Sequence, residues 1–551
     1  MRHLWTRLRR YPALLLLITV YVVSCLVVGV NALRARGGAP GSEGKKVLRF
    51  AHWQLEPGIR SALDRLIANY HELHPDVEVR QILIPEEGYF RWVNTQLIGR
   101  TAPDMIECGL GGTVAWALWP KFYARYFMPL DRYVDEPNPY NKGTPLEEAP
   151  WRKTYFDEME GGYDDSLQSY YRVPLSAFTV RLYYNKPLIE EVWGEQFPQT
   201  YEAFIELCEA LEEHGRQQGR RLVPISGSGY NFRQFFDAFQ TALTADYLRQ
   251  LDRDYDGSVS RIESGAAIYA GTVSMTEPAI RANFELVREL SEYFPQGYMS
   301  LDRDEAVFLF LQGHAAMIST GSWDFQSLHV QSEFEIAVAD IPLPSRDNPR
   351  YGRYVAGPRT EAGLEGGFPM AITKTSAHPD EALDFLQYAS SLKKNEELNR
   401  NMFWLPVIKG ARPRDELKPF APRIEGYSPA INYEGPGVEL TYGQLTPEFL
   451  SGKLSYEQFV ERLMDAYRRE SAGGVYEYVK NNQQTLTQQM RFAALRRADM
   501  TGAAGAGASV TGSSETQYKR IMEAYVGQVG SYNNEIRTWV ELARSSKADR
   551  G

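Results

Sequence analysis

The first half of the chain alternates between two spacings of apolar residues. Residues 47–53 (VLRFAHW) read as a strand, residues 75–85 as a second strand, and residues 103–109 as a third that ends in glycines. A helix is predicted after each of the first two strands, the first with four apolar residues on one face: Leu63, Leu66, Ile67 and Tyr70. Such alternation is typical of parallel-sheet α/β units, in which ligands bind beyond the carboxyl ends of the strands. Trp53 and Gly109 occupy such positions.

A second series of elements begins near residue 170. Residues 170–188 are rich in β-branched and aromatic residues, which favours a strand. Residues 313–323 predict a buried strand that ends in a turn, and residues 366–372 another strand. Two further helices are predicted from apolar spacing, the second with Pro379 in its first turn: Phe204, Leu207, Cys208 and Leu211 mark one, and Ala382, Phe385, Leu386 and Ala389 the other.

The N-terminus has the pattern of a membrane anchor. Four arginines precede an uncharged apolar run over residues 13–30, which is just long enough to cross a bilayer. The arginines are expected to stay in the cytoplasm, which places the main body outside the inner membrane. A cleaved signal peptide is the alternative, because Val30–Ala32 has the small residues of a processing site. The arginines are Arg2, Arg7, Arg9 and Arg10.

Composition narrows the class of protein. The 551 residues are 43% hydrophobic and 24% charged, which is ordinary for two or three globular domains. The formal net charge of -10 argues against a nucleic-acid partner. Besides Cys25 in the anchor, the cysteines are Cys108 and Cys208. A disulfide between them is one alternative, but we expect two isolated buried thiols, because a chain of this size does not need a covalent link to fold.

Five segments occur in a characteristic order between residues 47 and 467. They are APDMIECG followed by FMPLDRYV; YYRVPLSAFTVRLYYNKPLIEEVWGEQFPQTYEAFIELCEAL; FLQGHAAMISTGSWDF; GGFPMAITKTSAHPDEALDFLQY; and SGKLSYEQFVERL. Their order and spacing resemble the extracellular solute-binding proteins of sugar ABC transporters, of the maltose-binding-protein type. The anchor and the region after about residue 473 depart from that family, whose usual member is a free periplasmic protein or a lipoprotein.

The resemblance implies a periplasmic-binding-protein-like α/β fold, in which two lobes close on a ligand by a hinge motion. Lobe 1 is expected to combine residues 47–170 with 300–350, and lobe 2 to combine residues 171–299 with 351–475. The other expected parts are a cytoplasmic tip and transmembrane anchor (1–36), a linker (37–46), and a helical C-terminal extension (476–551) with a Gly/Ala-rich linker (501–514). The extension either docks on the body or presents a surface to a partner protein.

The family's ligand is a carbohydrate, which has apolar C–H faces and a rim of hydroxyl groups. Its site therefore needs flat aromatic rings and planar hydrogen-bonding groups. The resemblance places Trp323 in the ligand cleft, whereas Trp53 and Trp404 either stack on the sugar or pack in the core. Arg233 either contacts the ligand or forms a salt bridge within a helix. Gly366 and Gly367 either allow the ligand to approach the backbone closely or serve a turn. The predicted set is Trp53, Gly109, Ser176, Phe178, Tyr230, Asn231, Arg233, Trp323, Gly366, Gly367 and Trp404.

The stretch DRDYDGSVSRIE, residues 252–263, has the spacing of an EF-hand calcium loop. The segment after it lacks a long amphipathic stripe, which argues against a paired calcium sensor. Two alternatives stay open: a hairpin turn built on Asp256 and Gly257, common in the family at this place, or a lone structural calcium. No cofactor is required in either case. The calcium ligands would be the side chains of Asp252, Asp254, Asp256 and Glu263 and the carbonyl of Ser258.

The sequence carries no HExxH, GxSxG or P-loop motif, so we expect no enzyme. The expected function is a membrane-anchored, extracytoplasmic solute-binding protein that captures a mono- or oligosaccharide and delivers it to an ABC permease. One alternative is a sensor that reports sugar occupancy to a membrane partner. A second is a hydrolase that acts on polysaccharides.

Overall fold

The computed structural model describes most of the chain after residue 44. The described residues are 45–55, 57–109, 119–164, 169–252, 259, 267, 273–362, 367–427 and 436–469, with ten isolated positions between 487 and 537. The predicted anchor, Gly366, the linker at 501–514 and nearly all of the acidic loop lie outside this range. Within the described residues, no helix combines the length and apolar character needed to cross a bilayer.

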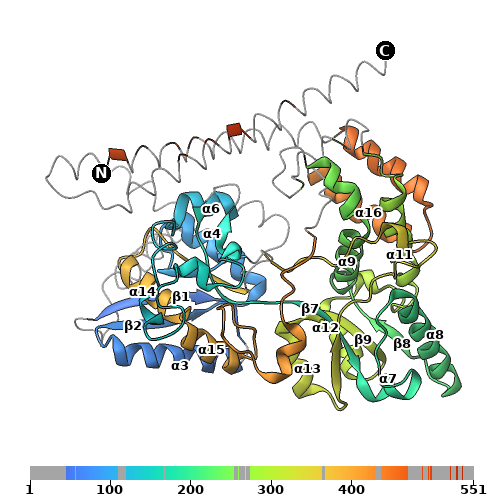
Figure 1. Cartoon of the computed structure of the whole chain (residues 1–551), viewed down its shortest axis with the longest axis horizontal. Helices are drawn as coiled ribbons and strands as arrows, with labels where there is room; N and C mark the ends of the chain where they lie inside the picture. The colour runs from blue at the N-terminus through green and yellow to red at the C-terminus, as the bar shows by residue number, and fades with distance from the viewer. Residues whose placement is uncertain are drawn as a thin grey trace, which may run out of the picture. The chain divides into compact units, whose positions relative to one another are not determined.

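The chain divides into two compact units (Figure 1). Unit 1 comprises Met1–Met128 and Met370–Ser390, and unit 2 comprises Pro129–Pro369 and Ser391–Gly551. The following paragraphs treat each unit by itself.

The sheet of unit 1 is built around β1 (Lys46–His52). β1 pairs in parallel with β2 (Val77–Leu83) and with β3 (Met105–Glu107), as expected from the alternation in the sequence. β11 (Gly367–Ile372) pairs with β3 in the antiparallel direction. Because parallel crossovers are right-handed and β1 lies between β2 and β3, the helix after β1 and the helix after β2 cover opposite faces of the sheet (Figure 1).

Those two helices are α3 (Pro57–Leu73) and α4 (Glu86–Gly99). The predicted apolar face of α3 is buried along its whole length, from Leu63 to Tyr70. The Tyr70 ring packs against α14 (Pro379–Ala389), with its hydroxyl donating to Asp384 at 2.7 Å. α6 (Trp119–Tyr126) completes the described helices of this unit.

Unit 2 contains a mixed sheet in the order β10-β7-β9-β8. β9 runs parallel to β8 and antiparallel to β7. The described strands whose residues fall in unit 2, in this sheet and outside it, are β4 (Tyr163–Asp164), β5 (Ser169–Tyr170), β6 (Val173–Ser176), β7 (Val180–Asn185), β8 (Val223–Ser226), β9 (Ala315–Gly321) and β10 (Ile336–Ala339). The helices are α7 (Lys186–Val192), α8 (Tyr201–Gln217), α9 (Gly229–Leu248), α11 (Pro278–Ser291), α12 (Arg303–Leu311), α13 (Phe325–Gln331), α15 (Leu392–Met402) and α16 (Pro436–Leu450).

Short 3₁₀ turns connect several of these elements. They are η1 (Pro139–Asn141), η2 (Trp151–Thr154), η3 (Glu160–Gly162), η4 (Arg249–Leu251), η5 (Tyr298–Ser300), η6 (Ser322–Asp324), η7 (Gly352–Tyr354) and η8 (Asp415–Phe420).

Two strands pair with strands of the opposite unit from the one expected. β9 belongs to residues 300–350, which were expected in lobe 1, yet it pairs with β7 and β8 of unit 2. β11 was expected in lobe 2, yet it pairs with β3 of unit 1. Both strands are buried along their whole length, so their uniformly apolar pattern identifies a strand without indicating which sheet receives it.

The core of unit 2 surrounds α8. Its predicted apolar face, Phe204 to Leu211, is buried and joins one continuous cluster with residues of α9 and α11. Cys208 lies in this cluster, and burial raises the pKa of its thiol well above the usual range. Cys108 in unit 1 is also buried, and both cysteines are free thiols, as expected.

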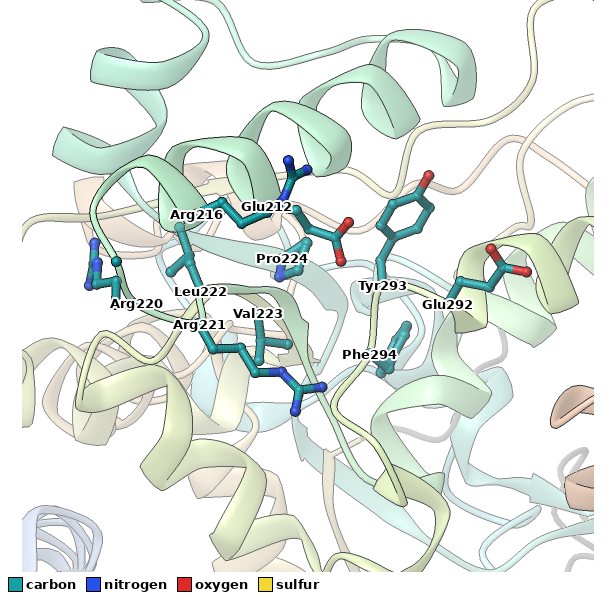
Figure 2. A pocket seen from close by; sticks show the side chains of 11 residues that line it. Glu212, Arg216, Arg220, Arg221, Leu222, Val223, Pro224, Glu292, Tyr293 and Phe294 are labelled. Atoms are coloured by element: carbon teal, nitrogen blue, oxygen red, sulfur yellow. The ribbon is translucent and has the colours of Figure 1, made fainter.

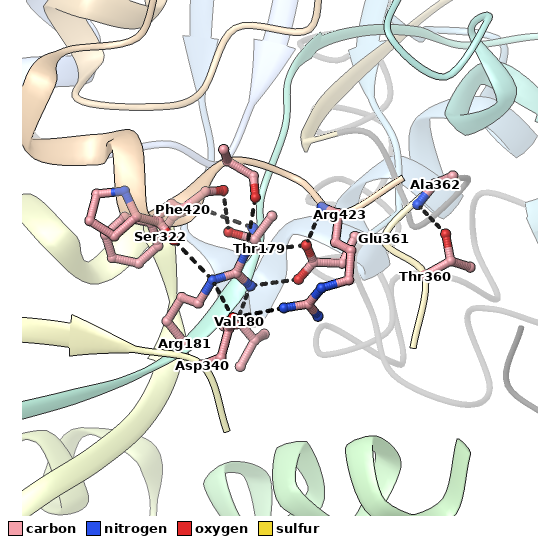
Figure 3. A network of polar contacts seen from close by, with 12 residues as sticks. Thr179, Val180, Arg181, Ser322, Asp340, Thr360, Glu361, Ala362, Phe420 and Arg423 are labelled. Atoms are coloured by element: carbon pink, nitrogen blue, oxygen red, sulfur yellow. Dashed lines mark hydrogen bonds and ion pairs between the residues drawn. The ribbon is translucent and has the colours of Figure 1, made fainter. Parts of the chain in front are cut away.

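A buried arginine holds the loops beside β7 together (Figure 3). The guanidinium of Arg181, only 4% exposed, pairs with both carboxylate oxygens of Glu361 at 2.6 and 3.2 Å. It also lies 3.2 Å from Asp340 and donates to three backbone carbonyls, those of Val180, Pro419 and Ala421. Desolvation of the charge is thereby offset by a full set of acceptors.

Candidate functional site

Four aromatic side chains of unit 2 form one continuous cluster, which we call the aromatic site: Phe178, Trp323, Trp404 and Phe368. Phe178 follows β6 and is half-buried, and Trp323 lies in η6 directly after β9 and is also half-buried. Phe178 stands edge-on to Trp323 and to Trp404, with ring centroids 5.4 and 4.9 Å apart. Phe368 also stands edge-on to Trp404, with ring centroids 5.9 Å apart. The structure thus brings together three predicted ligand residues that are far apart in the sequence.

Two glycines make room for two of these rings. A Cβ atom at Gly321 would lie 2.2 Å from the Trp323 indole, and one at Gly367 would lie 2.6 Å from the Phe178 ring. Carbon atoms that are not bonded do not approach this closely, so each ring can occupy its position only because the adjoining residue is a glycine without a Cβ atom. The predicted roles of Gly367, close approach of a ligand to the backbone or a turn, stay predictions beside this contact with Phe178.

Polar side chains lie beside Trp323. The Cζ atom of Arg303, at the start of α12, lies 5.9 Å from the Trp323 ring centroid and 5.7 Å from that of Tyr230. Arg303 forms an ion pair with Asp324, which also accepts a hydrogen bond from Thr320 Oγ1 at 2.6 Å. A guanidinium and a carboxylate beside a flat ring can donate to and accept from the hydroxyl groups of a polyol.

Sequence reasoning missed Arg303 and Asp324. Asp324 lies inside the quoted GSWDF segment, directly after Trp323. That position could have indicated that its carboxylate lies at the candidate site. Arg303 is twenty residues away on another helix, so its place beside Trp323 follows from the packing of α12 on β9.

Other predicted residues have contacts within the protein itself. Asn231 is fully buried at the start of α9: its Oδ1 accepts from Ser228, and its Nδ2 donates to the carbonyl of Ser319 at 2.8 Å. These three bonds fix the first turn of α9, which carries the 41% exposed Tyr230. Ser176 is also buried and donates to Asn399 at 2.6 Å.

Arg233 and Trp404 are placed at opposite extremes of exposure. The Arg233 side chain is 75% exposed and lies 3.7 Å from Asp237, one helical turn along α9. Trp404 is only 3% exposed, so its edge-on contact supports the Phe178 ring from within the protein. Ligand contacts of these residues, and of Asn231 and Ser176, stay predictions.

In unit 1, predicted residues gather where β1 and β3 end. Trp53 is half-buried, and its ring stands edge-on to Tyr89 of α4, with centroids 5.0 Å apart. Gly109 follows β3 with a φ of 103°, a left-handed conformation that favours glycine. Glu107, which was not predicted, is fully buried and accepts hydrogen bonds from residues 53 and 54.

The acidic loop is described at two positions only. Asp252 follows η4, and its backbone N–H donates to the carbonyl of Arg249 at 3.3 Å. Asp254, Asp256, Ser258 and Glu263 lie outside the described residues, so the calcium site stays a prediction. Within the part of the chain that the structure describes, no three His, Cys, Asp or Glu side chains are grouped as a metal site requires.

A separate cavity of about 500 Å³ opens where β8 begins (Figure 2). Three arginines, two glutamates and Tyr293 line it together with apolar residues, and none of the predicted ligand residues contributes. Its lining is Glu212, Arg216, Gly219, Arg220, Arg221, Leu222, Val223, Pro224, Glu292, Tyr293 and Phe294.

The class of protein follows from comparison with known families. Residues 56–396, more than half of the chain, match the family described as "Bacterial extracellular solute-binding protein". The protein therefore belongs to this family, which confirms the resemblance seen in the sequence.

Two relatives are similar over most of their length. The "Multiple sugar-binding protein" of Streptococcus mutans is 22% identical over 427 residues, which cover 75% of this chain and 86% of the relative. An uncharacterized ABC transporter extracellular-binding protein of Pyrococcus horikoshii is 20% identical over 469 residues, which cover 82% of this chain and 90% of the relative.

Solved structures share the fold. A chitin oligosaccharide binding protein matches with a TM-score of 0.53 and 17% identity, covering 78% of this chain and 99% of that protein. Maltose-bound MalE3 of T. maritima matches with a TM-score of 0.53 and 17% identity, covering 77% and 99%. RafE in complex with raffinose matches with a TM-score of 0.51 and 17% identity, covering 77% and 99%. The expected α/β fold of periplasmic sugar-binding proteins is thereby confirmed.

Proposed function

We propose that this protein captures a carbohydrate outside the cytoplasm for import by an ABC transporter. The observation that carries the proposal is the half-buried Trp323 indole with the Arg303–Asp324 pair beside it. Relatives support the same conclusion, because one is named a multiple sugar-binding protein and fold neighbours are described with chitin oligosaccharide, raffinose and maltose.

Each part of the aromatic site has a task in this proposal. The exposed face of Trp323 covers the apolar C–H face of a sugar ring, while Phe178, seated on Gly367, keeps the indole from tilting. Arg303 donates to ligand hydroxyl groups and Asp324 accepts from them. Tyr230 adds an exposed ring with a polar hydroxyl at the edge.

The location and partners are also part of the proposal. We infer an N-terminal anchor at residues 13–30 in the inner membrane, with the body on the outer side. A permease of an ABC transporter is the proposed recipient of the sugar. The family consists of binding proteins, which supports the expectation that the chain is not an enzyme.

A thermal-shift screen on the detergent-solubilised full chain tests the function. Maltotriose, raffinose and N,N′-diacetylchitobiose are suitable probes, and a bound sugar stabilises the folded state by about 2.7 kcal/mol at a hundredfold excess over Kd. Trp323→Ala is expected to abolish the shift. Trp193→Ala is the matched control, because Trp193 is a half-buried tryptophan of the same unit at the end of α7, outside the aromatic site. An equal loss in both variants, or no shift with a broad sugar panel, would contradict the proposal.

A further inference from the structure

One face of α9 carries charged side chains beyond the aromatic site. Tyr230, Arg233 and Asp237 are spaced three and four residues apart, so they lie on one side of this helix. Tyr230 lies beside Arg303, which also lies beside Trp323, and both Tyr230 and Arg233 are exposed. The helix rises by about 10 Å from Tyr230 to Asp237. This face therefore leads from the proposed ligand surface of unit 2 to a second group of charges.

Two guanidinium groups share one carboxylate oxygen in this second group. Oδ2 of Asp237 lies 3.7 Å from Nε of Arg233 and 3.6 Å from Nη1 of Arg359. Both distances are longer than an ordinary protein hydrogen bond, so the charges attract one another while the guanidinium donors stay unfilled. Because two cations face one carboxylate, the group carries an excess of positive charge.

Arg359 lacks hydrogen-bond acceptors although it is partly buried. Its side chain is 27% exposed, and its buried Nε atom has no hydrogen-bond partner among the described residues. Burial lowers the pKa of its guanidinium, although the charge of Asp237 opposes the shift. The buried Arg181 differs, because it pairs with a carboxylate and donates to three backbone carbonyls. A guanidinium that has lost water without gaining acceptors is costly, and such groups gather at functional sites.

The segment that carries Arg359 is anchored on both sides. Tyr427 donates its backbone N–H to the carbonyl of Pro358 and accepts the N–H of Thr360, both at 3.0 Å. Glu361, the next residue, is fixed by its ion pair with a buried arginine (Figure 3). The backbone at position 359 is therefore in place before a ligand arrives, which lowers the entropy cost of binding there.

We propose that Arg233 and Arg359 form a site for an anionic group of the captured sugar: a carboxylate, a sulfate or a phosphate. The inference rests on the proposed function and deepens it, because it makes the ligand an acidic saccharide. The planar donor fork of arginine matches two oxygen atoms of such a group. A bound oxyanion gives Arg359 the acceptors that it lacks and offsets the excess positive charge beside Asp237. A neutral sugar brings hydroxyl groups only and leaves that charge uncompensated.

Matched pairs of acidic and neutral saccharides test the proposal. The detergent-solubilised full chain is titrated calorimetrically with trigalacturonate and its methyl ester, glucose 6-phosphate and glucose, and N-acetylglucosamine 6-sulfate and N-acetylglucosamine. At least one acidic member is expected to bind about tenfold or more tightly than its neutral counterpart, as charge-assisted hydrogen bonds predict. The difference is expected to shrink at high salt, because Arg233 is exposed to solvent.

Arg233→Gln and Arg359→Gln each remove one guanidinium. Each is expected to lower the affinity for the preferred acidic saccharide by about tenfold while the neutral counterpart binds as before. Arg359→Lys keeps the charge without the planar fork, so its affinity is expected to be intermediate. Unliganded melting temperatures check folding, which Arg233→Gln leaves intact because that side chain is 75% exposed. Arg216→Gln on α8, whose side chain is 71% exposed, is the matched control outside the site.

The outcomes are distinct. An acidic preference that both glutamine variants remove supports the proposal. Equal affinity within every pair, or a preference that survives both variants, overturns it and leaves the carbohydrate function intact. Free acetate, sulfate or phosphate that binds as tightly as the acidic saccharides also overturns it, because the site then takes a free anion. Absence of binding by every sugar, acidic or neutral, overturns the proposed function instead.

Discussion

The ring of Phe178 stands nearly perpendicular to the indole of Trp323, with an angle of 82° between their planes. The two residues are far apart in the sequence: Phe178 follows β6, and Trp323 follows β9. They are also joined through the backbone, because the N–H of Ser322 donates to the carbonyl of Thr179 at 2.8 Å. Neighbouring residues thus hold the two rings in one fixed arrangement, which suits a preformed ligand surface.

A methyl group beneath the indole is expected to disable this surface. Gly321→Ala places a Cβ where the Trp323 ring lies, so the ring must move, at a cost of about 1–3 kcal/mol in stability. In Gly321→Ala, both the thermal shift caused by the sugar and the urea concentration at the unfolding midpoint are expected to decrease.

Gly443→Ala is the matched control for that substitution. Gly443 lies exposed within α16, and a Cβ there meets no atom within 4 Å. Alanine in a helix interior is favoured over glycine by up to about 1 kcal/mol, so this variant is expected to be more stable and to bind normally. Equal behaviour of the two variants would show that Gly321 does not seat the indole.

Local pattern was enough to predict the elements and part of the site. The strands β1, β2, β3, β9 and β11 all fall where apolar spacing placed them, and Trp323 and Phe178 were identified through motifs. The sheet that receives β9 or β11 could not be predicted, because a strand buried on both faces has the same pattern in either sheet. Arg303 and Glu107 were missed for a related reason: their roles depend on partners brought close only by the fold.

The buried ion pair of Arg181 predicts a large effect on stability. Glu361→Ala leaves a guanidinium that is 4% exposed without its bidentate partner, so the free energy of unfolding is expected to fall by about 3–5 kcal/mol. Asp415→Ala removes an exposed pair with Lys418, whose side chains are 89% and 71% exposed, and is expected to be near neutral. Urea midpoints of the two variants provide the comparison, and similar midpoints would contradict the assigned role of Arg181.

Removal of calcium distinguishes the two interpretations of residues 252–263. If Asp252, Asp254, Asp256 and Glu263 hold a calcium ion with the carbonyl of Ser258, EDTA is expected to lower the melting temperature and added calcium to restore it. A hairpin turn on Asp256 and Gly257 predicts the same melting temperature in EDTA and in calcium. Asp254→Asn with Glu263→Gln serves as the control, since it must remove any calcium-dependent shift.

The pH dependence of stability is expected to carry a contribution from His52. This buried side chain ends β1, and burial lowers its pKa to about 4, although a hydrogen bond with Gln81 at 2.8 Å opposes the shift. Because the unfolded chain takes up the proton near pH 6.5 and the folded chain does not, stability falls as the pH decreases from 6.5 to about 4 and then levels off. The contribution is on the order of 3 kcal/mol at the acidic end of this range.

His52→Gln is expected to remove this contribution, so the difference in unfolding free energy between pH 7 and pH 4.5 should become smaller in the variant. His329→Gln, at an exposed position on α13, is the control, and an unchanged pH dependence in His52→Gln would contradict the assignment.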